Sequence, residues 1–316
     1  MKGLNQYLPK IGWGILLSWS VAVTAEAEIN TASSDEAALS LFQQMGQALT
    51  QLSYNGIFTH EHSGNLDPIR ITHQVINDVE ANRFKHLTGS ANAIVQRSDA
   101  SLCAREDLSQ QTLLPRTDDS LDSHYLLKLV GEDRVADRSV YIVNALPRDE
   151  FRYGYRLALD TETAMPLMMA TISGNRMLER FQFIDFQPVT NTAEVVDELI
   201  EPKRDEVLLL GGCVQTADLA HWRLGWVPSG FQLISAKVTD SAEMLAFSDG
   251  MSRFSVFVSR VLGRKTLEGE ARRGGTLVYL DKIVIAGEPY QVSIVGEVPK
   301  TTAQKVASAV IPLARR

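Results

Sequence analysis

The clearest hydrophobic pattern in the chain lies between Arg152 and Phe186. Positions 153, 155, 157 and 159 are apolar or aromatic, and the positions between them are polar or small. Alternation with a period of two is typical of a strand with one buried face. Polar residues at 160–163 and the pair Gly174-Asn175 separate this segment from two further apolar runs, at 166–172 and 177–186. The pattern predicts an antiparallel meander of three strands that presents a broad aromatic and aliphatic face.

A helical period marks the region before the meander. Five apolar residues recur at helical spacing and would form one stripe: Leu39, Phe42, Met45, Leu49 and Leu52. Ser33 and Glu36 have the spacing of a capping box at the start of that helix. Alternating runs then predict strands at 54–62, 69–76, 83–87, 93–97 and 135–146. We expect a short helix at 124–130 and a long polar loop at 99–122.

A second domain is predicted after the meander. The pattern breaks at about residue 190, and residues 202–206 are charged and turn-like. We therefore divide the chain into a first domain at 28–190, a linker at 191–220 and a C-terminal domain at 221–316. The last domain contains alternating runs at 222–227, 231–238, 244–247, 254–261, 276–285 and 290–296, followed by a short helix after Pro299. Strands with one helix predict an α+β module.

The first 27 residues have the pattern of a secretory signal peptide. Lys2 and Lys10 precede an apolar run from Ile11 to Ala25, and Ala25-Glu26-Ala27 fits a cleavage site. The apolar run is shorter than the roughly 20 residues that a membrane span needs. We expect export to the periplasm, with Glu28 as the first residue after cleavage.

Charge divides unevenly between the two predicted domains. Residues 28–220 hold 16 Lys and Arg against 29 Asp and Glu, a net charge of −13, whereas residues 221–316 hold 13 against 8, a net charge of +5. The two halves could simply attract each other across a polar interface. Alternatively, the basic half could recruit an acidic peptide or an anionic lipid head group. Export argues against nucleic acid as the partner.

The search for catalytic motifs gives no candidate. The chain has no Gly-x-Ser-x-Gly, P-loop, Gly-x-Gly-x-x-Gly or His-Glu-x-x-His motif. His60 and His62 share one strand face, and pairing of His60 with His73 would bring three imidazoles toward a zinc ion. That arrangement needs one particular register and has no further ligand at motif spacing, so exposed histidines are the preferred interpretation. We expect no metal, no cofactor and no enzymatic activity.

The chain has two cysteines, Cys103 and Cys213. An exported protein can form a disulfide, which would tie the predicted linker to the first domain. Two unpaired thiols are the alternative, and the sequence does not decide between them.

Several segments together resemble the RseB/MucB family of periplasmic regulators of the sigma-E (or AlgU-type) factor. In chain order they are Tyr54-Asn55-Gly56-Ile57-Phe58, Arg134-Val135-Ala136-Asp137-Arg138, 152–160, Phe247-Ser248-Asp249-Gly250, Phe254-Ser255-Val256-Phe257 and Gly296-Glu297-Val298-Pro299. They extend over nearly the whole chain after the signal peptide. One departure is Asp137, which stands where the family usually has glycine.

The resemblance implies a mostly antiparallel α+β fold. The expected N-terminal domain is an unclosed β-barrel with helices, similar to the lipoprotein carriers LolA and LolB, and a smaller α+β domain follows. The family binds the periplasmic region of an anti-sigma factor (RseA/MucA type), shields it from site-1 proteolysis, and is released on sensing lipopolysaccharide or mislocalised lipid. The alternative is a periplasmic lipid or lipoprotein carrier without a regulatory partner. A homodimer is a further option.

Two sets of residues are candidates for these roles. An open barrel could hold acyl chains, since each buried methylene is worth about 0.8 kcal/mol; the candidate lining residues are Phe58, Tyr153, Tyr155, Leu157, Met168, Phe181 and Phe183. An ordinary core beneath the helix is the alternative role for them. The candidates for an acidic partner segment or phosphates are Arg253, Arg260, Arg264, Lys265, Arg272 and Arg273. A solvated basic face is the alternative there.

Overall fold

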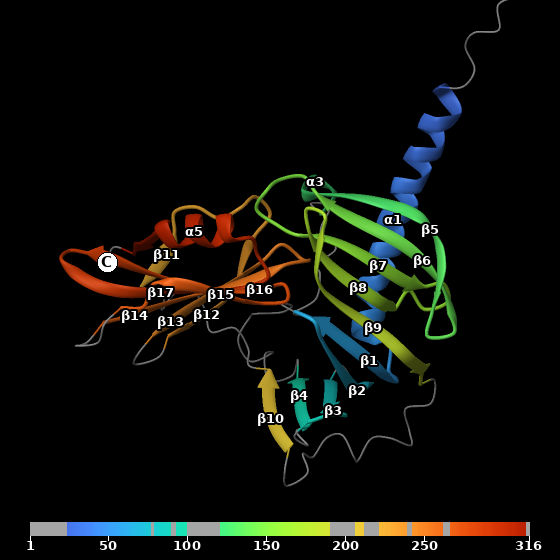
Figure 1. The fold of residues 1–316 in the computed structure, drawn as a ribbon, viewed down its shortest axis with the longest axis horizontal. Coiled ribbons are helices and arrows are strands. Elements are labelled where there is room, and N and C mark those ends of the chain that lie inside the picture. Colours follow the sequence, from blue (N-terminus) through green and yellow to red (C-terminus); the bar gives the residue numbers. More distant parts are fainter. Residues whose placement is uncertain are drawn as a thin grey trace, which may run out of the picture.

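The fold is built on two sheets that lie side by side (Figure 1). The computed structural model describes residues 24–76, 79–89, 93–99, 121–189, 206–211, 221–238, 242–261 and 266–313. Within these residues no helix is long and apolar enough to cross a membrane. Three features of the sequence lie outside these residues: the two cysteines, Cys103 and Cys213; residues 100–120 of the expected polar loop; and most of the predicted signal peptide.

The N-terminal domain is a ten-stranded sheet with one long helix, α1 (Thr24–Gln51). The strand order is β10-β4-β3-β2-β1-β9-β8-β7-β6-β5, and no pairing among the described residues joins the two edges, so the sheet is unclosed. The strands are β1 (Tyr54–His62), β2 (Asn65–Ile76), β3 (Val79–His86), β4 (Ala93–Asp99), β5 (Tyr125–Val135), β6 (Arg138–Pro147), β7 (Gly154–Asp160), β8 (Pro166–Ser173), β9 (Arg176–Pro188) and β10 (Glu206–Gly211).

The C-terminal domain is a six-stranded antiparallel sheet with helix α5 (Lys300–Ser308) on one side (Figure 1). Its order is β12-β13-β14-β17-β16-β15, and a short pair, β11 with β18, lies beside it. The strands are β11 (Trp222–Leu224), β12 (Gln232–Val238), β13 (Glu243–Ser248), β14 (Arg253–Arg260), β15 (Gly269–Arg273), β16 (Thr276–Ile285), β17 (Glu288–Gly296) and β18 (Val310–Pro312). The predicted α+β fold class, with an open N-terminal sheet and a smaller second module, is confirmed.

The predicted meander is present as β7, β8 and β9, and β9 continues the sheet through antiparallel pairing with β1. Gly56 allows this pairing, because a Cβ at that position would lie 2.7 Å from both the Phe183 ring and the Asp185 carbonyl oxygen. Such a contact is far inside van der Waals distance. Glycine in the Tyr54–Phe58 segment therefore lets the Phe183 ring pack directly on the backbone of β1.

Several predicted elements differ from the structure. The helix expected at 124–130 is wrong, since α3 (Leu121–His124) has only four residues and β5 follows at once. The strand expected at 135–146 is interrupted by a tight turn at Ala136 and Asp137, whose φ angles of 50° and 64° are left-handed. Helix α1 begins at Thr24, so the predicted capping box lies inside it. Part of the expected linker, β10, is a strand that pairs in parallel with β4.

Hydrophobic side chains form three clusters. In the first domain one cluster joins α1 to β5, β6 and β7, with Phe42, Met45 and Tyr155 among its members. A second gathers residues of β1, β2, β6, β7 and β9, including Tyr54 and Phe183. The third is the core of the C-terminal domain, where α5 packs on the six-stranded sheet. Each domain thus has its own core, and some members of these cores, such as Tyr153 and Tyr155, also reach the other domain.

Candidate functional site at the interface of the two domains

A buried ion pair joins the two domains. Arg152, at the start of the meander, donates from Nη1 to Asp249 Oδ2 at 2.7 Å, and neither side chain is exposed to solvent. Asp149 accepts two further bonds from the same guanidinium, at 3.0 and 2.9 Å. The guanidinium also lies over the rings of Tyr125 and Phe231, one from each domain, with 5.4 Å to each centroid.

Hydrogen bonds within the turn between β13 and β14 hold the Asp249 carboxylate in position for this ion pair. Its Oδ1 accepts the backbone N–H groups of Met251 and Ser252, at 3.0 and 2.7 Å, and its Oδ2 also accepts the Tyr125 hydroxyl at 3.2 Å. Burial raises the pKa of the Asp249 carboxyl, while the Ser252 bond and the charge of Arg152 oppose that rise. A buried charge is tolerated only with such partners. Arg152 and the β13–β14 turn therefore depend on each other.

Two tyrosine hydroxyls of the meander also reach the second domain. Tyr153 donates to the Val298 carbonyl oxygen at 2.7 Å, just before α5, and accepts a bond from Arg272. The Tyr155 hydroxyl lies 2.6 Å from Ser252 Oγ. Burial is the main cause that raises the pKa of both phenols. Three of the segments that carry the family resemblance, at 152–160, 247–250 and 296–299, thus meet at one interface.

The candidate lipid-lining residues do not form a single surface. Tyr153, Tyr155 and Leu157 are almost completely buried in the cluster beneath α1. Phe183 belongs to the other N-terminal cluster, and Phe58 and Met168 are partly buried against it. Half-buried Phe181 stacks on the His60 ring with 4.1 Å between centroids. In this structure the two tyrosines act as core and interface residues and Phe183 is also buried, whereas half-buried Phe58, Phe181 and Met168 remain the more accessible candidates.

The candidate basic residues are distributed in a similar way. Arg272 and Arg273 lie on β15, an edge strand absent from the sequence prediction, and both contact the N-terminal domain. Arg273 donates to His62 Nε2 at 3.1 Å and lies 3.6 Å from Asp67. Arg260 is exposed and pairs with Glu288 at 3.0 Å, and Arg253 is also exposed. Arg264 and Lys265 fall outside the described residues. The basic C-terminal domain and the acidic N-terminal domain therefore attract each other at least through Arg273 and Asp67.

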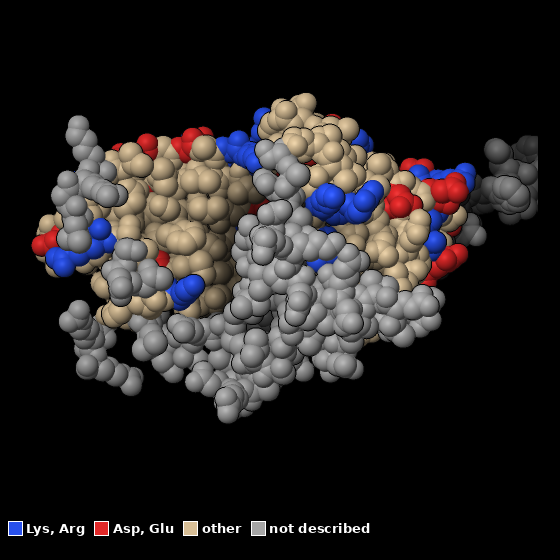
Figure 2. All heavy atoms as spheres, turned by 90° about the horizontal axis from the view of Figure 1, so that it is seen from below, with Lys and Arg blue, Asp and Glu red and all other residues tan. Residues whose placement is uncertain are grey.

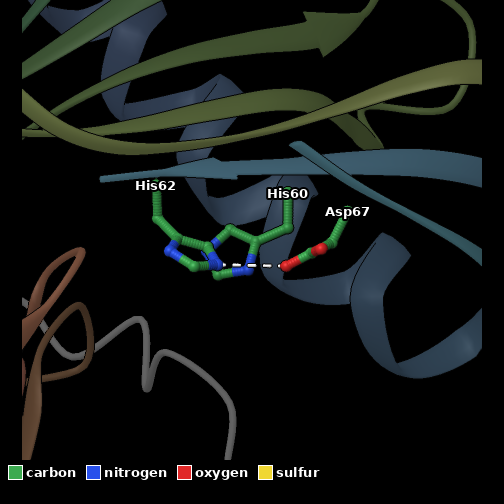
Figure 3. A group of neighbouring side chains, drawn as sticks. All are labelled: His60, His62 and Asp67. Carbon is green, nitrogen blue, oxygen red and sulfur yellow. Dashed lines mark hydrogen bonds and ion pairs between the residues drawn. The ribbon is translucent and has the colours of Figure 1, made fainter. Parts of the chain in front are cut away.

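A group of possible metal ligands lies close to Arg273. His60 and His62 of β1 and Asp67 of β2 place ligand atoms within 4.8 Å of one another (Figure 3). The register considered for three histidines is wrong, because His60 lies opposite Asp67 and His73 lies opposite Tyr54. The third ligand is therefore a carboxylate rather than an imidazole.

Comparison with known proteins identifies the relatives of this chain. Models of the MucB/RseB N-terminal domain and the MucB/RseB C-terminal domain match residues 37–200 and 216–311. The chain belongs to the MucB/RseB family. The sigma factor AlgU regulatory protein MucB of Pseudomonas aeruginosa is 32% identical over 284 residues, which cover 85% of this chain and 89% of MucB. The sigma-E factor regulatory protein RseB of Escherichia coli (strain K12) is 26% identical over 315 residues, 92% of this chain and 94% of RseB.

Solved structures of a family member extend the likeness to both domains. A crystal structure of MucB in complex with MucA(peri) is 29% identical, covers 88% of this chain and all of that chain, and has a TM-score of 0.70. MucB crystallised alone gives a TM-score of 0.65 with the same identity and 98% of that chain covered. The matched relatives are named regulatory proteins, which agrees with the expectation that members of this family are not enzymes.

Proposed function

We propose that this member of the MucB/RseB family is a periplasmic negative regulator of the envelope stress response. It binds the periplasmic region of an anti-sigma factor of RseA/MucA type, shields that region from site-1 proteolysis, and is released on sensing lipopolysaccharide or mislocalised lipid or lipoprotein. One observation carries the proposal: the similarity, over both domains, to a MucB that was crystallised with MucA(peri). The lipid signal and the protection from proteolysis follow from the family resemblance.

The face of the C-terminal sheet opposite α5, which no described helix covers, is the surface we assign to the anti-sigma factor. Buried and half-buried residues alternate along β13, β14 and β17, and the buried set packs under α5. The half-buried set on the opposite side includes Met244, Phe257, Val278, Leu280 and Val295. Figure 2 shows this side of the domain as a largely uncharged surface, with charged residues mainly around it. An apolar face with a charged margin suits an amphipathic peptide.

Arg260 is the described basic candidate best placed to add charge recognition, because it is exposed at the end of β14. By alternation it lies on the α5 side with Val258, so it would meet a part of the anti-sigma factor that extends past the strand end. Its present partner, Glu288, is equally exposed, so an acidic group of the anti-sigma factor could replace it at little cost. Arg272 and Arg273 are less suitable in this domain arrangement, since both contact the first domain.

Calorimetry with the purified chain from Glu28 onward and a synthetic periplasmic segment of the anti-sigma factor tests the proposal. We expect Phe257→Ser to weaken binding about tenfold or more, as loss of a central apolar contact does. Leu313→Ser, which changes an exposed leucine away from the sheet face, is the matched control. Arg260→Gln should weaken binding and lower its salt dependence, whereas Glu288→Gln should not weaken it. No binding by the unmodified chain would refute the proposal.

The finer steps need their own measurements. Saturating amounts of this chain should slow cleavage of the anti-sigma segment by the site-1 protease, and added lipopolysaccharide should restore cleavage. A carrier without a regulatory partner would instead move lipid between vesicles at a rate that the anti-sigma segment does not change. Lipid transfer together with unaltered cleavage would therefore favour the carrier.

A further inference from the structure

We propose that His60, His62, Asp67 and Glu179 form a binding site for a divalent cation of the zinc class. The donor set is two imidazoles and two carboxylates, which are ligands that Zn²⁺ takes in proteins. Ligand atoms of His60, His62 and Asp67 lie within 4.8 Å of one another (Figure 3). Glu179 joins them through its Oε2, which lies 3.0 Å from His60 Nε2.

The register of three neighbouring strands builds this arrangement. His60 and His62 are two residues apart on β1, so their side chains leave the same face of the sheet. Asp67 of β2 lies directly opposite His60, and Glu179 of β9 lies directly opposite His62. Directly opposed residues have Cβ atoms about 4.5–5.5 Å apart. The sheet therefore directs four potential ligands to one place.

His62 provides a second, independent observation. Its side chain is only 3% exposed, its Nε2 lies 3.1 Å from Asp67 Oδ2, and its Nδ1 has no hydrogen-bond partner among the described residues. Buried polar atoms without a partner are uncommon in native proteins. A cation bound through Nδ1 would give that nitrogen a partner, in exchange for the present contacts of Nε2 with Asp67 and Arg273.

The charge around the cluster also favours a cation, because Asp67 and Glu179 bring two carboxylates to it. Arg273 now supplies positive charge to the cluster, through its contacts with His62 and Asp67. Its side chain is 72% exposed and can move away into solvent.

It follows that the ion and Arg273 compete for the same atoms. Arg273 belongs to β15 of the C-terminal domain, whereas the four ligands belong to the N-terminal domain. Binding of the ion would therefore release one contact between the domains. By linkage, removing the guanidinium should tighten binding of the ion.

Zinc titration of the metal-free chain, without an affinity tag, tests the inference. We expect one Zn²⁺ per chain by elemental analysis, and a cobalt-substituted form with the visible spectrum of a tetrahedral site. His60→Asn and Asp67→Asn should each weaken zinc binding by at least about 10- to 100-fold, which is the loss typical of removing an outer-shell partner of a ligand, and Arg273→Gln should strengthen it. His221→Asn is the matched control, since His221 is exposed and pairs with Glu243 elsewhere.

Asp67 is only half-buried, so Asp67→Asn keeps the test valid if a histidine variant fails to fold. Zinc binding that is absent, or that is unchanged by both ligand substitutions, would overturn the inference. Weaker binding in Arg273→Gln would overturn the competition between the ion and the guanidinium.

Discussion

Asp249→Asn should destabilise the protein far more than its change of one atom suggests. The substitution removes the charge that faces Arg152 and places an amide N–H₂ group, or a neutral oxygen, against two donors, the Arg152 guanidinium and the Tyr125 hydroxyl. Breaking a fully buried pair by neutralising one partner typically costs about 3–5 kcal/mol. Asp149 still accepts two bonds from the guanidinium. We therefore expect a loss at the lower end, about 3 kcal/mol.

Urea unfolding followed by tryptophan fluorescence measures this loss. With a slope of about 3 kcal/mol per molar urea, the midpoint should fall by about 1 M. If the two domains unfold in separate steps, the shift should appear in the first step, because the interface is lost as soon as either domain unfolds. Arg260→Gln breaks an exposed pair in the same domain and should leave the midpoint unchanged. Equal midpoints for the two variants would refute the idea that the buried pair holds the domains together.

Three further outcomes are expected. Burial alone would raise the pKa of Asp160, but hydrogen bonds, mainly from Arg138, outweigh this and hold the pKa below the usual carboxyl range. The stabilisation by Asp160 is therefore complete above about pH 4 and is lost as the pH falls through the lowered pKa. Asp160→Asn should flatten the acid side of a stability–pH curve. Tyr155→Phe, which loses the 2.6 Å contact with Ser252, should cost about 1 kcal/mol in unfolding free energy and leave lipid binding unchanged if the ring is structural. Gly296→Ala would place a Cβ 2.4 Å from the backbone of β14 and should cost about 3 kcal/mol or more, seen as rapid proteolysis of the C-terminal domain.

The sequence was most informative where local pattern and burial agree. Along the meander, alternation and turn residues specify both the strands and their order, because each strand pairs with its neighbour in the chain. The local pattern does not identify β5, because its leucines and valine at 126–130 also fit a helical spacing and predict a short helix. Burial of Tyr125 and Leu127 on one face decides in favour of a strand.

Turns without glycine were harder to predict. Ala136 and Asp137 both have left-handed φ angles, although neither residue type signals them as strongly as glycine does. The alternating pattern therefore predicts one long strand where the structure has a hairpin. The clue in the sequence is Asp137, which stands where the family that the chain resembles usually has glycine.

The interface was the least predictable part. Arg152 occupies a polar position in an alternating pattern, and Asp249 occupies a turn, so each had a sufficient local explanation. Their contact depends on how two domains dock, which no local period encodes. Alternation brings His60 and His62 to one strand face, but the sequence pattern favoured exposed histidines over a metal site, and no local signal gives the register that places Asp67 beside them.

The interface described above also constrains the order of folding. Its bonds join residues separated by 97 positions at Arg152, 145 at Tyr153 and 211 at Arg273. Contacts so distant along the chain form slowly, and domains of this size generally fold as units before they dock. Arg152 and the two tyrosine hydroxyls of the N-terminal domain therefore lack their partners until α5 and the β13–β14 turn dock. We expect docking to be the last kinetic step of folding, and the period before it to be the one in which these polar groups are most open to incorrect contacts.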